Sequence, residues 1–291
     1  MQFAIRYLSR YRYEADVADN INALRVRPAS TSCQRLDDFT LRLTPDARQH
    51  RHEDYFGTDV VEFEVTRPHR ELIIDALAHV TTEPAPAPSG SGWAQIAEDG
   101  YREAGTEFLM QTDDAPGHTL LAELRSAIDD AASPLDAVLL VAELIPGRLD
   151  YRKGATYVDS PLAHVLDIGA GVCQDFVHLG LNLLRARGIA ARYVSGYLYT
   201  HSHNGDAAAG AHAAGQPSVE VDTHAWIEAL IPQAEERPCW VGVDPTNRGF
   251  AGERHVKIGH GRHYADVPPI RGIYRGPARS TLEASVTMTA L

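Results

Sequence analysis

The first 80 residues alternate apolar and polar positions in short runs. In segment 39–43 the apolar residues fall at every second position, and segment 61–65 repeats the pattern with glutamates between them. A period of two is that of a half-buried β-strand. Turn-forming residues at 44–46 and 56–59 separate the runs. This pattern predicts an N-terminal antiparallel β domain of sandwich type over residues 1–83.

A change of composition marks the end of this domain. Residues 84–92 combine a Pro/Ala repeat with a Gly/Ser stretch, which is typical of a linker. We therefore expect a separate α+β core domain over residues 93–268. Residues 269–291 are expected to form a C-terminal extension, with the hypothesis that it packs as a strand on the N-terminal domain. No internal repeat is visible.

Helical spacing replaces the period of two after the linker. Ser133-Pro-Leu-Asp136 combines an N-cap serine, a proline at the first helical position and an acid in the first turn, which predicts a helix to about residue 145. Apolar residues at helical spacing predict a second helix that begins near Cys173 and ends at Gly188. Three strand-like segments then follow, over 189–199, 223–231 and 240–244.

Charge and composition narrow the possible functions. With 27 basic and 39 acidic residues the net charge is −12, which makes nucleic acid an unfavourable partner. We expect no membrane association, because no segment approaches the roughly 18 apolar residues of a spanning helix. The N-terminus alternates where a signal peptide would be continuously apolar, so a cytoplasmic location is expected. Cys33, Cys173 and Cys239 are odd in number and widely spaced, which disfavours a disulfide framework or zinc knuckle.

Cys173 has the position expected of a nucleophile. It lies at the predicted N-terminus of an amphipathic helix, where unpaired backbone N–H groups and the helix dipole favour the thiolate. The alternative interpretation is a buried structural cysteine, which is the common fate of a free thiol.

Hairpin geometry connects His224 with Asp244. If Ile231 and Cys239 flank the loop between the last two strands, the residue opposite position 224 is residue 246. Asp244 then lies two residues away on the same face, within reach of an imidazole–carboxylate hydrogen bond. The alternatives are an ordinary histidine and an aspartate that caps the turn before Pro245.

Four motifs in order resemble the transglutaminase-like superfamily, and in particular its bacterial branch of transglutaminase-like proteins and cysteine proteases with an N-terminal β domain. The motifs are Gly169-Ala-Gly-Val-Cys-Gln-Asp-Phe-Val-His178, Arg192-Tyr-Val-Ser-Gly-Tyr-Leu198, Thr223-His-Ala-Trp-Ile-Glu228 and Trp240-Val-Gly-Val-Asp-Pro-Thr-Asn247. The resemblance implies a papain-like α+β fold and a catalytic triad of Cys173, His224 and Asp244. Should Asp244 not be the third member, Asp222 and Asn247 are the alternatives.

The sequence specifies the residues that would stabilise an oxyanion less closely than it specifies the triad. The backbone N–H of Cys173 is the natural donor at a helix start. Tyr151 is a candidate for the second donor, with a core aromatic as its alternative. Gln174 either caps the helix or lines the cleft, and Trp226 either shields the histidine–aspartate pair or fills the core.

No cofactor is predicted. The chain has no third glycine of a dinucleotide fingerprint and no P-loop, H-E-x-x-H or EF-hand motif. The insertion over 201–215 holds several histidines that would suit a metal, but its small residues favour an exposed loop. Its position between two strands of the core makes it a candidate lid over the cleft.

These residues predict acyl transfer through a thioester on Cys173, with a peptide or protein as substrate. Hydrolysis makes the chain a cysteine protease or amidase, whereas transfer to an amine makes it a transglutaminase or peptide ligase. We expect hydrolysis to dominate. Two rival hypotheses are a non-catalytic binding module of the same fold and a metal-dependent hydrolase that uses the histidine-rich loop.

Overall fold

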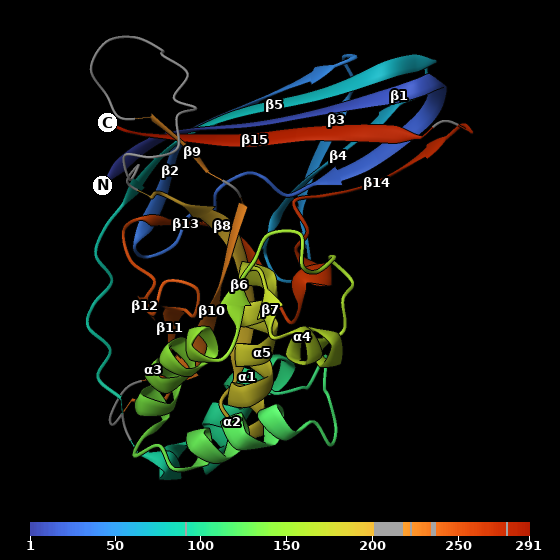
Figure 1. Cartoon of the computed structure of the whole chain (residues 1–291). Coiled ribbons are helices and arrows are strands. Elements are labelled where there is room, and N and C mark those ends of the chain that lie inside the picture. Colours follow the sequence, from blue (N-terminus) through green and yellow to red (C-terminus); the bar gives the residue numbers. More distant parts are fainter. Residues whose placement is uncertain (91, 201–217, 222, 234–236, 278) are drawn as a thin grey trace.

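The computed structural model describes residues 1–90, 92–200, 218–221, 223–233, 237–277 and 279–291. Figure 1 shows a long antiparallel sheet that lies over a mixed core of helices and a second sheet. The chain is therefore an α+β protein, as the sequence predicts.

Strand β1, which spans Gln2–Leu24, is the spine of the N-terminal sheet. Its first half pairs with β5 and β15, and its second half pairs with β4 and β14. The two halves therefore form one eight-stranded sheet that curves into a half-barrel, where a sandwich would have two separate sheets. The other strands are β2 Gln34–Thr44, β3 Gln49–Glu53, β4 Asp59–Val65, β5 His69–Thr82, β9 Ser218–Val221, β14 Ile270–Arg275 and β15 Ser280–Ala290.

The C-terminal extension returns to this sheet. Strand β15 pairs with β1 from Phe3 opposite Ala290 to Tyr13 opposite Ser280. On its other side β15 pairs with β9, which immediately precedes β10 of the core in the sequence. The N-terminal sheet is therefore hydrogen-bonded to a segment that leads directly into the core.

The core sheet has the strand order β12-β11-β10-β8-β13 and is antiparallel throughout. Its strands are β8 Ala191–Leu198, β10 Thr223–Ile231, β11 Cys239–Asp244, β12 Gly249–Phe250 and β13 His255–Gly261, and a short parallel pair joins β6 Asp150–Tyr151 to β7 Ala170–Gly171. The helices are η1 Trp93–Ala97, α1 Asp99–Gly105, η2 Thr106–Phe108, α2 Thr119–Asp129, α3 Pro134–Leu144, η3 Ile145–Gly147, α4 Leu162–Ile168, α5 Cys173–Ala186 and η4 Tyr264–Asp266.

Helix α5 lies at the centre of the core, between this sheet and the helices around it (Figure 1). Leu179, Leu183 and Leu184 of α5 pack with Ile227 and Ala229 of β10 in one buried apolar cluster. Because this helix is buried almost all round, its position relative to β10 is fixed by packing.

Several predicted elements are confirmed. Helix α3 begins after Ser133, whose Oγ accepts a hydrogen bond from the backbone N–H of Asp136 at 3.2 Å. Helix α5 begins at Cys173, and Gly188 adopts φ of 84° just beyond its end. The sequence patterns did not predict α2, α4 or β13.

No helix within the described ranges combines the length and apolar character that a membrane crossing needs. The candidate lid over 201–215 and the alternative residue Asp222 lie outside the described residues.

Candidate active site

The start of helix α5 is fixed by a local hydrogen-bond network around Asp175. The buried Oδ2 of Asp175 accepts from the backbone N–H of Val172 at 2.7 Å and from Oγ1 of Thr156 at 2.7 Å. A Cβ atom at Gly171 would lie 2.7 Å from the Asp175 side chain, so only glycine fits there. These contacts hold Cys173 as the first residue of the helix.

The backbone N–H of Cys173 is available to a ligand. In the described part of the chain it has no acceptor, as expected for the first turn of a helix, while the Val172 N–H is satisfied by Asp175. A carbonyl oxygen held beside Cys173 would meet this N–H group and the positive end of the helix dipole.

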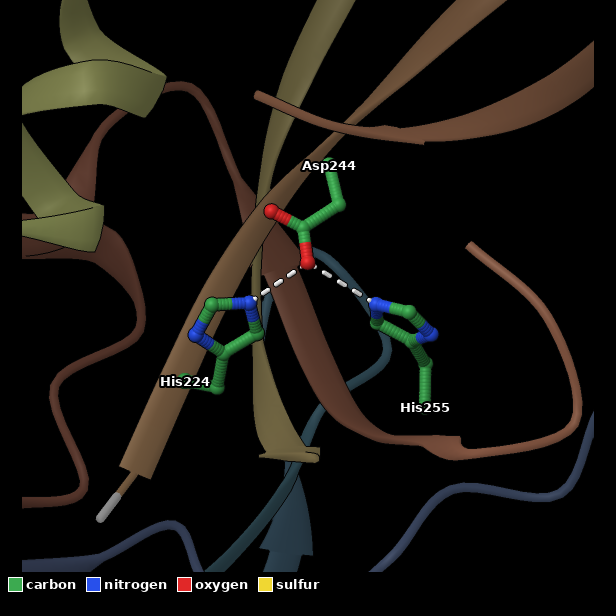
Figure 2. Close-up of side chains that lie close together, drawn as sticks. All are labelled: His224, Asp244 and His255. Carbon is green, nitrogen blue, oxygen red and sulfur yellow. Dashed lines mark hydrogen bonds and ion pairs between the residues drawn. The ribbon is translucent and has the colours of Figure 1, made fainter. Parts of the chain in front are cut away.

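Strand pairing brings His224 to Asp244. Ile231 lies opposite Cys239, which confirms the register predicted from the hairpin. His224 Nε2 lies 2.7 Å from Oδ2 of Asp244 and donates to it (Figure 2). Asp244 is the last residue of β11, so the hydrogen bond crosses the sheet diagonally.

Cys173 also interacts with His224 and raises its pKa. Because Nε2 is engaged by Asp244, Nδ1 is the ring nitrogen left to interact with Cys173, and it points away from Asp244 in Figure 2. Burial by itself lowers the pKa of His224, but the hydrogen bond to Asp244 and the interaction with Cys173 outweigh it and raise the pKa to about 9. The site therefore favours an imidazolium beside the sulfur at neutral pH.

Asp244 receives hydrogen bonds on both carboxylate oxygens. Its Oδ1 accepts the backbone N–H groups of Thr246 at 2.9 Å and Asn247 at 3.2 Å. Its Oδ2 accepts from His224 and from Nδ2 of Asn247 at 2.6 Å. Burial alone raises the pKa of Asp244, but these donors hold it well below its usual range, so the carboxylate stays ionised. Asp244 thus both caps its turn and orients His224.

A second histidine, which the sequence patterns did not indicate, contacts the same oxygen. Nε2 of His255 lies 3.0 Å from Oδ2 of Asp244 (Figure 2). His255 begins β13, which pairs with β8, whereas Asp244 ends β11. Strands β10 and β8 lie between β11 and β13 in the sheet. No local spacing links the two residues.

Trp226 packs against both histidines. Its ring centroid lies 6.3 Å from that of His224 and 5.2 Å from that of His255, and only 3% of Trp226 is exposed. A Cβ atom at Gly196 would overlap this ring, so β8 leaves the space that Trp226 occupies. Trp226 therefore shields the two imidazoles from water on one side.

The structure places the two candidate oxyanion residues differently. Tyr151 lies on β6 opposite Gly171 of β7, and 48% of it is exposed. Nε2 of Gln174 donates to the carbonyl oxygen of Val158 at 2.8 Å. Gln174 thus ties the loop before α4 to the start of α5, whereas the role of Tyr151 stays a prediction.

An ion-pair cluster holds the core strands together beyond Trp226. Glu228 on β10 accepts from Arg192 on β8 at 2.6 Å and from Lys257 on β13 at 2.6 Å. Burial by itself lowers the pKa of Lys257, and it falls to about 8 despite the neighbouring Glu228. Because Lys257 shares a strand with His255, this cluster fixes the position of His255.

His224, Asp244 and His255 are the one group of potential metal ligands within the described ranges, with ligand atoms within 4.8 Å of one another. The hydrogen-bond lengths from both imidazoles to Oδ2, and the Asn247 amide that donates to the same atom, leave little room for a cation. A zinc ion would need unprotonated ligand atoms at about 2.0–2.2 Å. The arrangement fits a hydrogen-bonded carboxylate better than a metal centre.

Comparison with known proteins agrees with both parts of the fold. Residues 3–81 match the bacterial transglutaminase-like N-terminal region, and residues 122–245 match the transglutaminase-like superfamily. A solved structure of a candidate cysteine protease from Cytophaga hutchinsonii is similar over 98% of this chain and 90% of its own, with a TM-score of 0.74 and 23% identity.

Two relatives match this chain in sequence, one over nearly its whole length and the other over about two thirds of it. An uncharacterised protein of Mycobacterium leprae is 34% identical over 282 residues, which cover 97% of this chain and 96% of that protein. The protein-glutamine gamma-glutamyltransferase of Pseudomonas aeruginosa is 27% identical over 64% of this chain and 28% of its own length. With both regions matched in order, the chain belongs to the bacterial branch of the transglutaminase-like superfamily.

Proposed function

We propose that this protein transfers acyl groups from amide bonds through a thioester on Cys173, and that water is its main acceptor. The hydrogen bond between His224 and the buried Asp244, together with the interaction of Cys173 with His224, carries this proposal. A nucleophile, a base and an orienting carboxylate in that order are what acyl transfer requires.

Each residue has a defined step. The Cys173 thiolate attacks the amide carbonyl carbon, and the C–N bond breaks as the His224 imidazolium gives its proton to the departing amine. His224 then takes a proton from water, whose oxygen attacks the thioester and releases the carboxylic acid and the thiolate. Asp244 keeps His224 Nδ1 directed at the sulfur. The Cys173 N–H stabilises the oxyanion, and we assign the Tyr151 hydroxyl as second donor.

Amine transfer is the second candidate function. The Pseudomonas aeruginosa relative carries the name of a protein-glutamine gamma-glutamyltransferase. The same thioester serves both reactions, because only the acceptor differs. We place hydrolysis first and infer a narrow class of peptide or isopeptide as substrate, because a protease of broad specificity in the cytoplasm, the location that the sequence favours, would damage its host.

The acceptor can be identified from the products. Wild-type protein is incubated with a peptide library and increasing primary amine, and mass spectrometry measures free acid against amide product. If hydrolysis is the main reaction, the product at millimolar amine should be mostly free acid. Mostly amide product would instead identify amine transfer as the main reaction. Cys173→Ala is the control, since any product it forms cannot arise from this thioester.

Thiol reactivity tests the proposal without a substrate. Iodoacetamide should label Cys173 much faster than Cys33 or Cys239 near neutral pH, because Cys173 is the cysteine that interacts with His224. Peptide mapping of the native protein measures all three rates at once. Equal rates would contradict a catalytic Cys173 and favour the binding-module hypothesis.

A further inference from the structure

We infer that His255 is a positioning residue of this site: it donates to the Asp244 oxygen that also orients His224, and so fixes the carboxylate and shares its charge. The inference rests on the proposed function of Cys173 and His224. It adds a fourth side chain, from a strand that the sequence motifs do not include.

The hydrogen bonds of His255 define its tautomer. The backbone N–H of Gly252 donates to Nδ1 of His255 at 3.1 Å, so Nδ1 is the unprotonated nitrogen. Nε2 therefore carries the proton and donates to Oδ2 of Asp244 at 3.0 Å. A neutral imidazole with one defined donor is thus directed at the carboxylate.

The surroundings hold the ring in this orientation. Trp226 meets the His255 ring nearly edge-on, with an interplanar angle of 73°. Residue 255 pairs with Leu198 of β8, and the ion pair between Lys257 and Glu228 anchors the same strand. Only 10% of the His255 side chain is exposed. The donor position is therefore set by the fold and not by a mobile loop.

Three donors compete for one oxygen. Oδ2 of Asp244 accepts from His224 at 2.7 Å, from Asn247 at 2.6 Å and from His255 at 3.0 Å. Each additional donor reduces the negative charge that Oδ2 offers to His224. Removing the His255 donor should strengthen the pull on the His224 proton and let the carboxylate rotate.

Few charged or titratable groups face His224. Asp244 on β11 and Cys173 on α5 act on it directly, and His255 on β13 lies with its ring centroid 6.1 Å away. Burial opposes the charge on His224, and Trp226 is uncharged. Within the described ranges, a change at His255 should therefore reach His224 through Asp244.

A matched pair of substitutions tests the role. His255→Gln keeps an amide N–H close to the position of Nε2, whereas His255→Leu fills similar space without a donor. In the full chain, the rate of Cys173 alkylation is followed against pH, with Cys33 and Cys239 as internal references. We expect His255→Leu to shift the alkaline limb of the profile to a higher pH, by roughly half to one pH unit. In His255→Gln the limb should lie close to its wild-type pH.

The inference and the proposed function fail in different ways. A wild-type Cys173 that reacts no faster than Cys33 removes the proposed function whatever His255 does. A reactive Cys173 whose pH profile is the same in wild type and both variants would leave His255 with a packing role only.

A spectroscopic readout covers a His255→Leu variant that does not fold. Long-range ¹H–¹⁵N spectra of ¹⁵N-histidine-labelled wild type should show His255 as the neutral Nε2–H tautomer, assigned by its absence in His255→Gln. An Nδ1–H tautomer would overturn the inference, because that ring could not donate to Asp244 through Nε2.

Discussion

Replacing Gly180 by alanine should force helix α5 away from strand β10. Gly180 is buried in the middle of α5, and an added methyl group would overlap Cδ1 of Ile227 and lie 3.1 Å from Cγ1 of Val141. The glycine therefore sets how closely the helix approaches the sheet. Cys173 lies on the same helix and His224 on the same strand, so this spacing also sets their contact.

Two opposing effects determine the magnitude. Alanine is about 1 kcal/mol better than glycine in a helix interior. Overpacking a well-filled core costs about 1–3 kcal/mol. The single variant should thus lose up to about 2 kcal/mol, and its net change alone does not measure the overlap.

A double-mutant cycle isolates the overlap. Ile227→Val removes Cδ1, the atom that the new methyl group meets, and by itself should cost about 0.5–1.5 kcal/mol. In the double variant the alanine methyl fills the space left by Cδ1, so stability should return close to that of the wild type. Urea unfolding of the four proteins should give a favourable coupling of about 1–3 kcal/mol. Alkylation of Cys173 should slow in Gly180→Ala and recover in the double variant.

The cycle gives a clear refutation. Independent sites add within about 0.5 kcal/mol, so a smaller coupling would show that Gly180 and Ile227 do not compete for space. A recovery of stability without recovery of alkylation would separate the packing of α5 from the contact between Cys173 and His224.

Three further predictions concern charge. Asp244→Asn should keep the fold but lower turnover by roughly 10⁴-fold, because the amide favours the wrong tautomer of His224. Steady-state kinetics on an identified substrate measures this, and near wild-type turnover would show that Asp244 has no part in the mechanism. The acylation rate should fall above about pH 9, because the His224 imidazolium that protonates the amine is present below its raised pKa and lost above it; a rate that still rises beyond pH 10 in rapid-mixing experiments would contradict this. Glu228→Gln should cost about 3–5 kcal/mol in urea unfolding, because it leaves the buried charges of Arg192 and Lys257 uncompensated, and a loss under about 1 kcal/mol would show that solvent screens them.

Local patterns in the sequence determined several features of this protein. The cap at Ser133 and the helix from Cys173 towards Gly188 follow from spacing within a few turns. The register that carries His224 towards Asp244 follows from one short hairpin, because antiparallel strands joined by a loop pair symmetrically about its centre. Neighbours in sequence are necessarily neighbours in space here, so the pattern suffices.

The contacts of His255 and Gln174 in the site are not encoded by any local sequence pattern. His255 contacts Asp244 although β10 and β8 lie between β11 and β13 in the core sheet, so no hairpin register relates the two residues. Gln174 finds its partner in the carbonyl of Val158 only after the loop folds back on α5. Neither residue differs in type from an ordinary polar surface residue, so its role became visible only in the folded chain.

The same distinction applies to the N-terminal sheet. Alternation predicted its strands, but the sharing of β1 between two halves, and the return of β15 to lie beside it, join residues as far apart as Phe3 and Ala290. Period-two patterns specify which face of a strand is buried and not which strand lies beside it. Which distant strands pair depends on how the apolar faces of all the strands and helices are buried together, and this is a property of the tertiary structure.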